Sequence, residues 1–239
     1  MNSLRPLTYE QYMVLVRARR PAVVKDDFVV AECRGNAVLD VGCIDHSIRR
    51  IEELGDRWLH GRIAEVASEV VGVDILAEEA AELRGRGYEI VVADAQHLRL
   101  DRRFDRVVLG DILEHVENPG ELLSTALCHV SPGGRILLST PNPFYIGRLL
   151  TALAKNYVGV NPQHVAWFDP KVVFRLGQRV GLAVVDFHWA TTRYEEFRDL
   201  AGLKGRASRL LVRAVESRRP VCRSDYVVVL IPAEAGPLS

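Results

Sequence analysis

Two carboxylates and an imidazole stand close together in the short segment Asp111-Ile112-Leu113-Glu114-His115. The segment follows Phe104 to Gly110, an apolar run that reads as a buried strand. If a helix begins near Asp111, then residues 111, 114 and 115 share one helical face, because they are three and four positions apart. Carboxylates and an imidazole that converge at the end of a strand predict a metal site or an acid–base site.

A second set of acids is associated with the earlier strands. Asp40 lies inside the first predicted strand, and Asp74 and Asp94 end the second and the third. In open α/β sheets ligands bind outside the carboxyl ends of the strands, where an acid can accept hydrogen bonds from ribose hydroxyls. Asp94 and the backbone N–H of Ala95 offer matching groups to an adenine edge. Such acids can also simply cap the helices that follow, but three in register favour a ligand of the nucleoside type.

Short apolar, β-branched runs alternate with helical stretches along most of the chain. This alternation predicts an α/β fold with a mostly parallel, seven-stranded sheet and helices on both faces. The expected strands are Ala37–Val41, Glu69–Asp74, Glu89–Asp94, Phe104–Leu109, Gly134–Ser139, Leu182–Phe187 and Tyr226–Ile231.

The remaining segments fit around that sheet as parts of one domain, residues 1–239. Residues 1–34 are expected to form an N-terminal helical extension, with a helix near residues 8–20. Residues 141–169 contain prolines, glycines and several aromatic residues, and are expected to form a small lid over the carboxyl edge of the sheet.

Charge and composition limit the classes of partner. The formal net charge is zero, so a nucleic acid is possible as a partner but not favoured over a small molecule or a saccharide. The run Val227 to Ile231 is far too short to span a bilayer. The four cysteines form no C-x-x-C pair, which favours reduced thiols and a cytoplasmic location. Nothing in the pattern sets an oligomeric state.

Several short strings occur in the order of a known family. Val38–Cys43, Val71–Ile75, Ala93–Ala95, Phe104–Val108 and Pro132–Gly134 resemble the motifs of class I S-adenosylmethionine-dependent methyltransferases. The resemblance covers roughly residues 35–190. It implies a Rossmann-like fold whose last strand is antiparallel, and an enzyme that uses S-adenosyl-L-methionine as methyl donor.

The resemblance also implies roles in donor binding. Gly42 would let the backbone approach the methionine part, Asp74 would bind the ribose diol, and Asp94 with Ala95 would hold adenine. The complete expected donor site consists of Asp40, Gly42, Cys43, Asp74, Ile75, Asp94, Ala95 and Gly110.

The sequence departs from the family pattern just after Gly42. Ile44 and His46 stand where the family usually has glycines, so Asp45 and His46 are expected to reshape the methionine pocket or the loop to pack differently. The gap between Gly42 and Asp74 is also longer than usual. An extra helix is expected there, with an apolar side formed by Ile48, Ile51, Leu54 and Trp58.

Two downstream strings extend the resemblance to metal-using subgroups. Ser139–Pro143 and Gln163–Phe168, with the segment 111–115, resemble the ubiquinone-biosynthesis O-methyltransferases and the small-RNA 3′-terminal 2′-O-methyltransferases. The implied metal ligands are Asp111, Glu114, His115 and His164, with the shorter Asp111 binding directly or through water. Carboxylate oxygens suit Mg²⁺, whereas two imidazoles shift the preference toward Mn²⁺, Fe²⁺, Co²⁺ or Zn²⁺.

The leading functional prediction is therefore O-methylation of a hydroxyl on a sugar, a phenol or quinol, or another metabolite. Glu114, His115 and His164 are the expected catalytic residues, with assistance from a divalent metal such as Mg²⁺ or Mn²⁺. One alternative is a metal-independent methyltransferase in which His164 or His115 acts as the base. Another is a donor-binding protein without catalysis, which Ile44 and His46 would favour.

Overall fold

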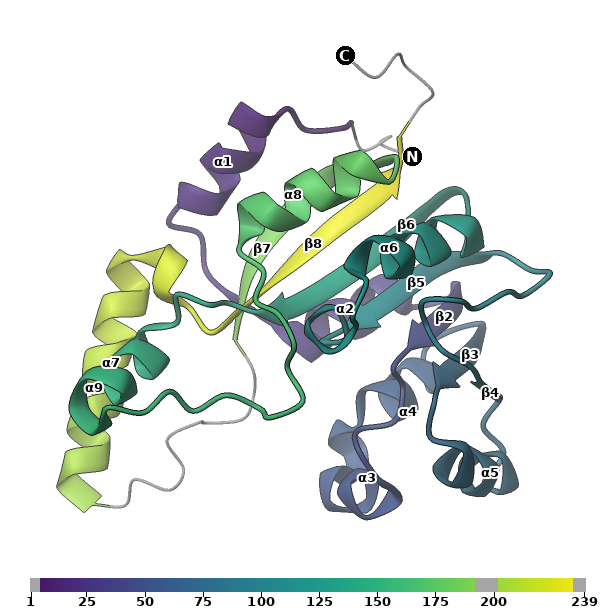
Figure 1. Ribbon diagram of the computed structural model, residues 1–239, viewed down its shortest axis with the longest axis horizontal. Coiled ribbons are helices and arrows are strands. Elements are labelled where there is room, and N and C mark those ends of the chain that lie inside the picture. Colours follow the sequence, from purple (N-terminus) through teal and green to yellow (C-terminus); the bar gives the residue numbers. More distant parts are fainter. Residues whose placement is uncertain (1–4, 192–201, 234–239) are drawn as a thin grey trace.

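The computed structural model describes residues 5–191 and 202–233, and within them eight strands form a single sheet. The strand order is β1-β7-β8-β6-β5-β2-β3-β4 (Figure 1). All neighbours pair in parallel except those of β8, which is antiparallel to both β6 and β7. The strands are β1 (Val23–Val24), β2 (Ala37–Val41), β3 (Glu69–Asp74), β4 (Ile90–Val92), β5 (Phe104–Gly110), β6 (Val130–Pro141), β7 (Leu182–Thr191) and β8 (Asp225–Pro232).

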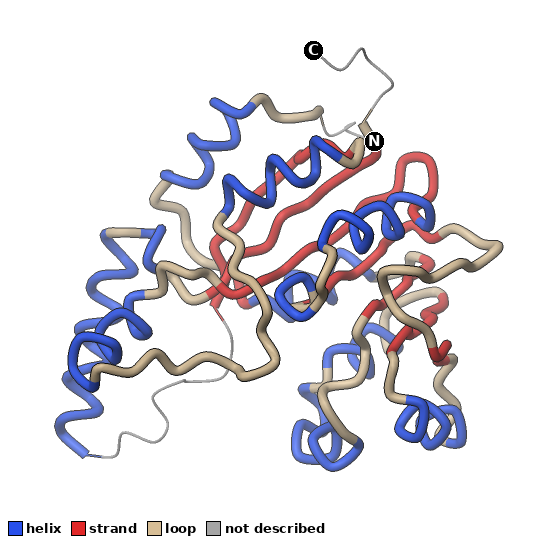
Figure 2. The backbone as a smooth tube through the Cα atoms, viewed as in Figure 1, coloured by secondary structure: helices blue, strands red, loops and turns tan. Residues whose placement is uncertain are grey.

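Helices cover both faces of the sheet, as Figures 1 and 2 show. Helices α1, α6 and α8 share one apolar core with the sheet, while α2 and α4 share another on the opposite face. The α-helices are α1 (Tyr9–Arg17), α2 (Lys25–Cys33), α3 (Ile48–Leu54), α4 (Leu59–Ala64), α5 (Ala77–Gly85), α6 (Pro119–His129), α7 (Ile146–Lys155), α8 (Pro170–Arg179) and α9 (Gly202–Arg218). Residues 5–191 and 202–233 also contain three short 3₁₀ turns, η1 (Gly55–Arg57), η2 (Leu113–His115) and η3 (Pro220–Cys222).

The mostly parallel α/β sheet and its antiparallel last strand confirm the fold expected from the sequence. The strand count differs by one, because Val23 and Val24 form β1 along the edge of β7. Residues 1–34 therefore contribute a strand as well as the helices α1 and α2. The β-branched pair Val23–Val24 is too short to give a pattern of period two, so its sequence carries no strand signal of its own.

The central strands are buried because helices cover both of their faces. Val107, Val108 and Leu109 of β5 have no exposed surface, and each such side chain contributes about 1.5–3 kcal/mol relative to exposure. The run of consecutive apolar residues, without polar alternation, is what a two-sided parallel strand requires.

The strand order changes direction between β2 and β5, at their carboxyl ends. From β2 the chain continues outward to β3 and β4, and it then returns to β5 on the other side of β2. The loops after these two strands therefore leave the sheet in opposite directions, which is where open α/β sheets bind ligands.

Residues 141–169 are joined to the rest of the structure at both ends. The side-chain amide of Asn142 donates to the carbonyl oxygens of Val221 (2.9 Å) and Arg223 (2.6 Å). At the other end the hydroxyl of Tyr226 donates to the carbonyl oxygen of Phe168 at 2.7 Å. Asp169 then caps α8 by accepting from the backbone N–H of Lys171.

No helix in the described part of the chain is both long and apolar enough to cross a bilayer.

Candidate donor and acceptor site

The loop after β2 depends on a glycine. Gly42 has φ +77°, in the left-handed region, and its N–H donates to the carbonyl oxygen of Val73 at 2.8 Å. A Cβ at this position would lie 2.9 Å from Cδ1 of Ile112, in the segment after β5. The backbone at Gly42 therefore lies close to the β5 end, which leaves no room for a side chain.

The residues that replace the family's glycines occupy two different environments. Ile44 is buried in an apolar cluster with Ile51 and Leu54 of α3. His46 has φ +61°, a conformation that is uncommon for residues other than glycine. The extra helix expected in this part of the sequence is α3, and Trp58 lies beyond it and donates from Nε1 to the carbonyl oxygen of Cys43 at 2.9 Å.

Asp74 holds the same loop from the end of β3. Its two carboxylate oxygens accept hydrogen bonds from the backbone N–H groups of Ile44 (2.9 Å) and Leu76 (3.2 Å). Burial raises the pKa of Asp74, and the backbone N–H bonds partly offset that rise. Asp74 therefore joins the β2 and β3 loops at the edge where the donor is expected.

The other expected donor residues are distributed around this edge, with one exception. Asp94 is exposed after β4. Its carboxylate accepts a hydrogen bond from the N–H of Gln96, which lowers the pKa of Asp94. The neighbouring Ala95 is buried. Asp40 is the exception, because its buried carboxylate accepts from Nδ1 of His60 in α4 at 2.8 Å. The residues placed at the carboxyl edge are thus Gly42, Cys43, Asp74, Ile75, Asp94, Ala95 and Gly110.

The expected helix at Asp111 is wrong. Strand β5 continues to Gly110, and the N–H of Asp111 donates to the carbonyl oxygen of Ser139, which extends the contact with β6. Asp111 then turns with φ +50°, and only the 3₁₀ turn Leu113–His115 follows. The fully buried side chain of Leu113 anchors that turn. Asp111 therefore does not share a helical face with Glu114 and His115.

Glu114, His115 and His164 nevertheless come together. One possible ligand atom from each lies within 4.8 Å of the others. The rings of His115 and His164 meet edge to face, with centroids 4.7 Å apart. Oε2 of Glu114 accepts from the hydroxyl of Thr140 at 2.9 Å. Oε1 of Glu114 and Nδ1 of His164 are buried and have no hydrogen-bond partner.

The electrostatics of these three residues leave the two imidazoles able to bind a cation, whereas the carboxyl of Glu114 must release its proton to do so. Burial and the charge of Asp111 raise the pKa of Glu114. Burial together with His46 lowers the pKa of His115, and burial together with His115 lowers that of His164. Both imidazoles are therefore neutral near pH 7 and keep a lone pair for a ligand. A bound divalent ion would give a partner to each of the two buried atoms, Oε1 of Glu114 and Nδ1 of His164. The residues present therefore fit the expected metal.

Asp111, the fourth expected ligand, lies outside this group. Its carboxylate forms an ion pair with Lys25, the first residue of α2, and accepts from the hydroxyl of Ser139 at 2.8 Å. Lys25 and Thr140 are neighbours of the site that the sequence does not single out as such. Lys25 lies outside every motif used above, whereas Thr140 lies within the string Ser139–Pro143.

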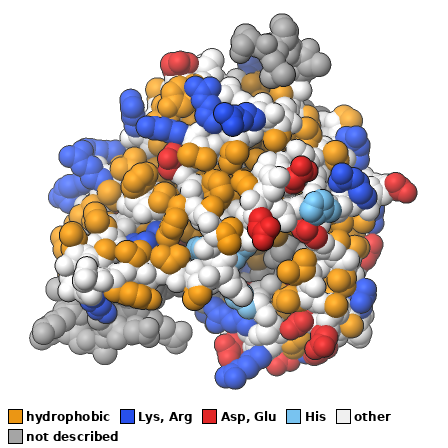
Figure 3. Space-filling model, in the orientation of Figure 1, with side chains coloured by type: hydrophobic (Ala, Val, Ile, Leu, Met, Phe, Trp, Pro, Cys, Tyr) orange, Lys and Arg blue, Asp and Glu red, His pale blue; other side chains and the backbone are white. Residues whose placement is uncertain are grey.

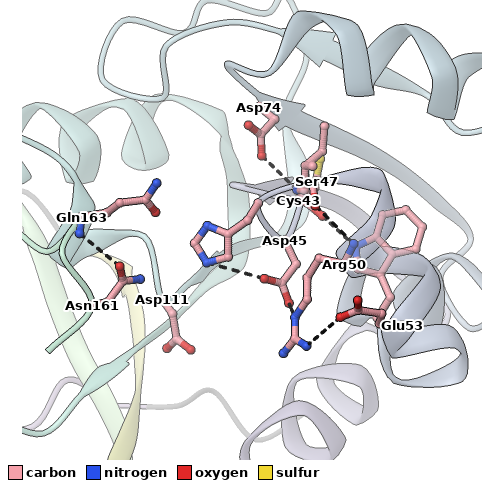
Figure 4. A network of polar contacts seen from close by, with 12 residues as sticks. Cys43, Asp45, Ser47, Arg50, Glu53, Asp74, Asp111, Asn161 and Gln163 are labelled. Carbon is pink, nitrogen blue, oxygen red and sulfur yellow. Dashed lines mark hydrogen bonds and ion pairs between the residues drawn. The ribbon is translucent and has the colours of Figure 1, made fainter. Parts of the chain in front are cut away.

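Figure 4 shows the two sides of the site facing each other. Cys43, Asp45 and Asp74 lie on the donor side, and Asp111, Asn161 and Gln163 lie across from them. On the donor side, the carboxylate of Asp45 lies 3.7 Å from Nε2 of His46. His46 in turn approaches His115, with ring centroids 6.4 Å apart. The expected donor site and the group of three candidate ligands are therefore adjacent.

The segment 141–169 borders the acceptor side and is rich in exposed apolar side chains. Phe144, Leu149 and Val165 are all more than half exposed, and Figure 3 shows hydrophobic side chains gathered over the part of the surface that carries α7. Trp167 is partly exposed, and the guanidinium carbon of Arg148 lies over its ring, 4.2 Å from the ring centroid. The backbone N–H of Val165 donates to the carbonyl oxygen of Glu114, so this segment contacts the ligand group directly.

Comparison with protein families gives a match over residues 18–186 to the family described as "Methyltransferase domain". The ubiquinone biosynthesis O-methyltransferase of Aeromonas salmonicida is 28% identical over 160 residues, which are 64% of this chain and 65% of the relative. The mitochondrial ubiquinone biosynthesis O-methyltransferase of Schizosaccharomyces pombe is 31% identical over 146 residues, or 56% and 49% of the two chains. The aligned part thus spans between about half and two thirds of these relatives.

Solved structures show the same fold at low identity. The magnesium protoporphyrin IX methyltransferase of Synechocystis PCC 6803, solved with bound SAH, has a TM-score of 0.57 and 15% identity, covering 96% of this chain and 90% of that one. A S-adenosylmethionine-dependent methyltransferase from Archaeoglobus fulgidus has a TM-score of 0.54 and 19% identity, covering 86% and 93%.

Proposed function

The chain belongs to the family of class I S-adenosylmethionine-dependent methyltransferases, and we propose that it transfers the methyl group of this donor to a hydroxyl with the help of a divalent metal ion. The observation that carries the metal part is the group formed by Glu114, His115 and His164, in which two buried atoms lack a partner. Support for a hydroxyl acceptor comes from the relatives, which are named as O-methyltransferases.

On the donor side, the proposed roles follow the edge of the sheet. Asp74 accepts from the ribose hydroxyls, and Asp94 and Ala95 face adenine. The glycine at position 42 lets the backbone approach the methionine part, and Cys43, Ile75 and Gly110 lie at the same edge. Asp40 supports this loop from the protein interior, where it bonds His60.

On the acceptor side, Glu114, His115 and His164 hold the ion. A divalent ion supplies Lewis acidity, which lowers the pKa of an acceptor hydroxyl. The side chains themselves orient the acceptor toward the neighbouring donor loop, and methyl transfer needs such an in-line approach. If no ion is used, the neutral imidazole of His164 has a free lone pair and takes the role of general base.

We propose that the acceptor is a phenol or a quinol. The support is the exposed apolar side chains of the segment 141–169, among them Phe144, Val165 and Trp167. These side chains suit an aromatic acceptor better than a sugar. Contact with an aromatic ring removes apolar surface from water on both sides, which is favourable. In this proposal residues 141–169 act as the lid of a single methyltransferase domain.

A labelled-donor assay tests the proposal. The metal-stripped protein is incubated with S-adenosylmethionine that carries a deuterated methyl group, and with a catechol, a monophenol or a sugar. Mass spectrometry then follows the methylated product after addition of Mn²⁺, Zn²⁺ or Mg²⁺. We expect turnover with the catechol. Chelation should abolish this turnover and added metal should restore it, and the Glu114→Gln variant should lack it. His188→Ala is the matched control, because His188 pairs with Asp186 in β7, outside the ligand group. Full turnover by chelated protein would exclude metal assistance and leave the histidine base.

A further inference from the structure

A buried lysine lies next to the proposed metal site. Lys25 begins α2, and its side chain is only 9% exposed. Its ammonium forms an ion pair with Asp111 and lies 3.7 Å from Oδ1 of Asp225. Burial alone would lower the pKa of Lys25, but the charges of Asp111 and Asp225 outweigh burial and raise it. Lys25 therefore stays protonated and is held as a fixed positive charge at the end of β5.

Both carboxylate oxygens of Asp111 are already engaged. Oδ2 accepts from the ammonium of Lys25, and Oδ1 accepts from the hydroxyl of Ser139. Asp111 has a left-handed backbone and precedes the 3₁₀ turn that carries Glu114 and His115, so its side chain does not project from that turn. Without Asp111 the buried ammonium would keep only its longer contact with Asp225. Weakening a buried ion pair is costly, so an ion that recruited Asp111 would have to compensate for the loss to Lys25.

We infer that Lys25 withholds Asp111 from the metal, so that the site offers one carboxylate and two imidazoles and favours a transition-metal ion over Mg²⁺. This inference rests on the proposed metal use of the same site. A set of two histidines and one carboxylate with open positions is typical of catalytic zinc and of non-haem iron sites. Mg²⁺ instead prefers an octahedron of oxygen ligands. Without Asp111, Glu114 is the single carboxylate of the ligand group.

The response to substitution at Asp111 decides the inference. Almost any site with nitrogen ligands binds Zn²⁺ more tightly than Mg²⁺, so the metal preference alone would not distinguish three ligands from four. Asp111→Asn keeps the size of the side chain, and asparagine tolerates a left-handed backbone. The variant is therefore expected to fold, which circular dichroism checks.

The experiment is isothermal titration calorimetry of the full, metal-stripped chain with Zn²⁺, Mn²⁺ and Mg²⁺. We expect Asp111→Asn to change the dissociation constant for Zn²⁺ by less than about threefold, and Glu114→Gln or His164→Ala to weaken it at least about tenfold. In Lys25→Met, which removes the charge and frees Asp111, the affinity for Mg²⁺ is expected to rise relative to that for Zn²⁺.

Each other result has a definite meaning. A tenfold or greater loss of Zn²⁺ affinity in Asp111→Asn would make Asp111 a ligand and overturn the inference, while the proposed metal use would stand. An unchanged ratio of Mg²⁺ to Zn²⁺ affinity in a folded Lys25→Met would also overturn it. If the unsubstituted chain binds none of the three ions, the proposed metal use fails first, and the inference fails with it.

Discussion

The backbone N–H of Val165 donates a hydrogen bond of 2.9 Å to the carbonyl oxygen of Glu114. This bond joins the segment that carries His164 to the turn that carries His115, and it uses no side-chain atom. This link between the proposed ligands therefore does not involve the Glu114 carboxylate. Substitutions of that side chain can accordingly be interpreted through its charge and its ligand atoms.

The first prediction concerns the pH dependence of stability in the metal-free protein. The pKa of Glu114 is raised by burial and by Asp111, so the folded state keeps this proton at a pH where the unfolded state has lost it. The free energy of unfolding then falls as pH rises from about 4.3, the ordinary value for Glu, through the raised pKa. Glu114→Gln removes this titration and keeps an acceptor for Thr140.

Urea denaturation in the presence of a chelator, from pH 5 to pH 9, measures this effect. The free energy of unfolding of Glu114→Gln should rise relative to that of the unsubstituted chain as pH increases. A constant difference across that range would show that Glu114 has the same pKa in both states.

The second prediction concerns Gly42. An alanine at this position must adopt φ +77° and must also displace Ile112, whose Cδ1 would lie 2.9 Å from the new Cβ. Gly35→Ala is the matched control, because Gly35 has φ +69° and nothing within 4 Å of its Cβ position. The left-handed backbone alone costs about 1–2 kcal/mol, so Gly42→Ala should lose more stability than Gly35→Ala. Equal losses in chemical denaturation would mean that Ile112 gives way freely.

The third prediction concerns donor binding by Asp74. Replacing Asp74 with Asn removes a charged acceptor, and hydrogen bonds to charged groups contribute about 1.5–3 kcal/mol. Calorimetry should therefore show an affinity for S-adenosylmethionine that is roughly 10- to 150-fold weaker. Asp105→Asn is the control, because Asp105 bonds the N–H of Ala37 at the opposite end of the sheet. Unchanged affinity in Asp74→Asn would remove this residue from the donor site.

The fourth prediction separates the two halves of the site. His164→Ala should leave the affinity for S-adenosylmethionine within about twofold, because His164 belongs to the acceptor side, while turnover falls at least about 100-fold. Parallel calorimetry and product measurements test both parts. A comparable loss of donor affinity would place His164 within the donor site instead.

Much of the fold could be predicted because its signals are local. The runs Val38–Val41 and Val70–Val73 are strands on their own composition, and a parallel sheet then brings Gly42 and Asp74 to one edge. Glu114, His115 and His164 could be grouped in advance only through the resemblance to a family, since no local pattern relates residue 164 to residue 115.

Other features could not be predicted, because they depend on residues far apart in the sequence. The spacing of Asp111 and Glu114 places them on one face only if the chain is helical between them. Here the N–H of Asp111 extends the hydrogen bonding between β5 and β6 by bonding to Ser139, and its carboxylate forms an ion pair with Lys25. The strand β1 forms only because the edge of β7 is open to it.

The two ends of the segment 141–169 have a consequence for descent rather than for catalysis. Asn142 attaches one end of this segment to η3 and the residue after it, and the bond from Tyr226 to Phe168 attaches the other end to β8. Insertions, deletions or exchanges between these points leave the strands and their registers intact. A lineage can therefore acquire a new acceptor by exchanging the surface parts of this segment on either side of His164, which stays in the group with Glu114 and His115, while the donor half passes on unaltered.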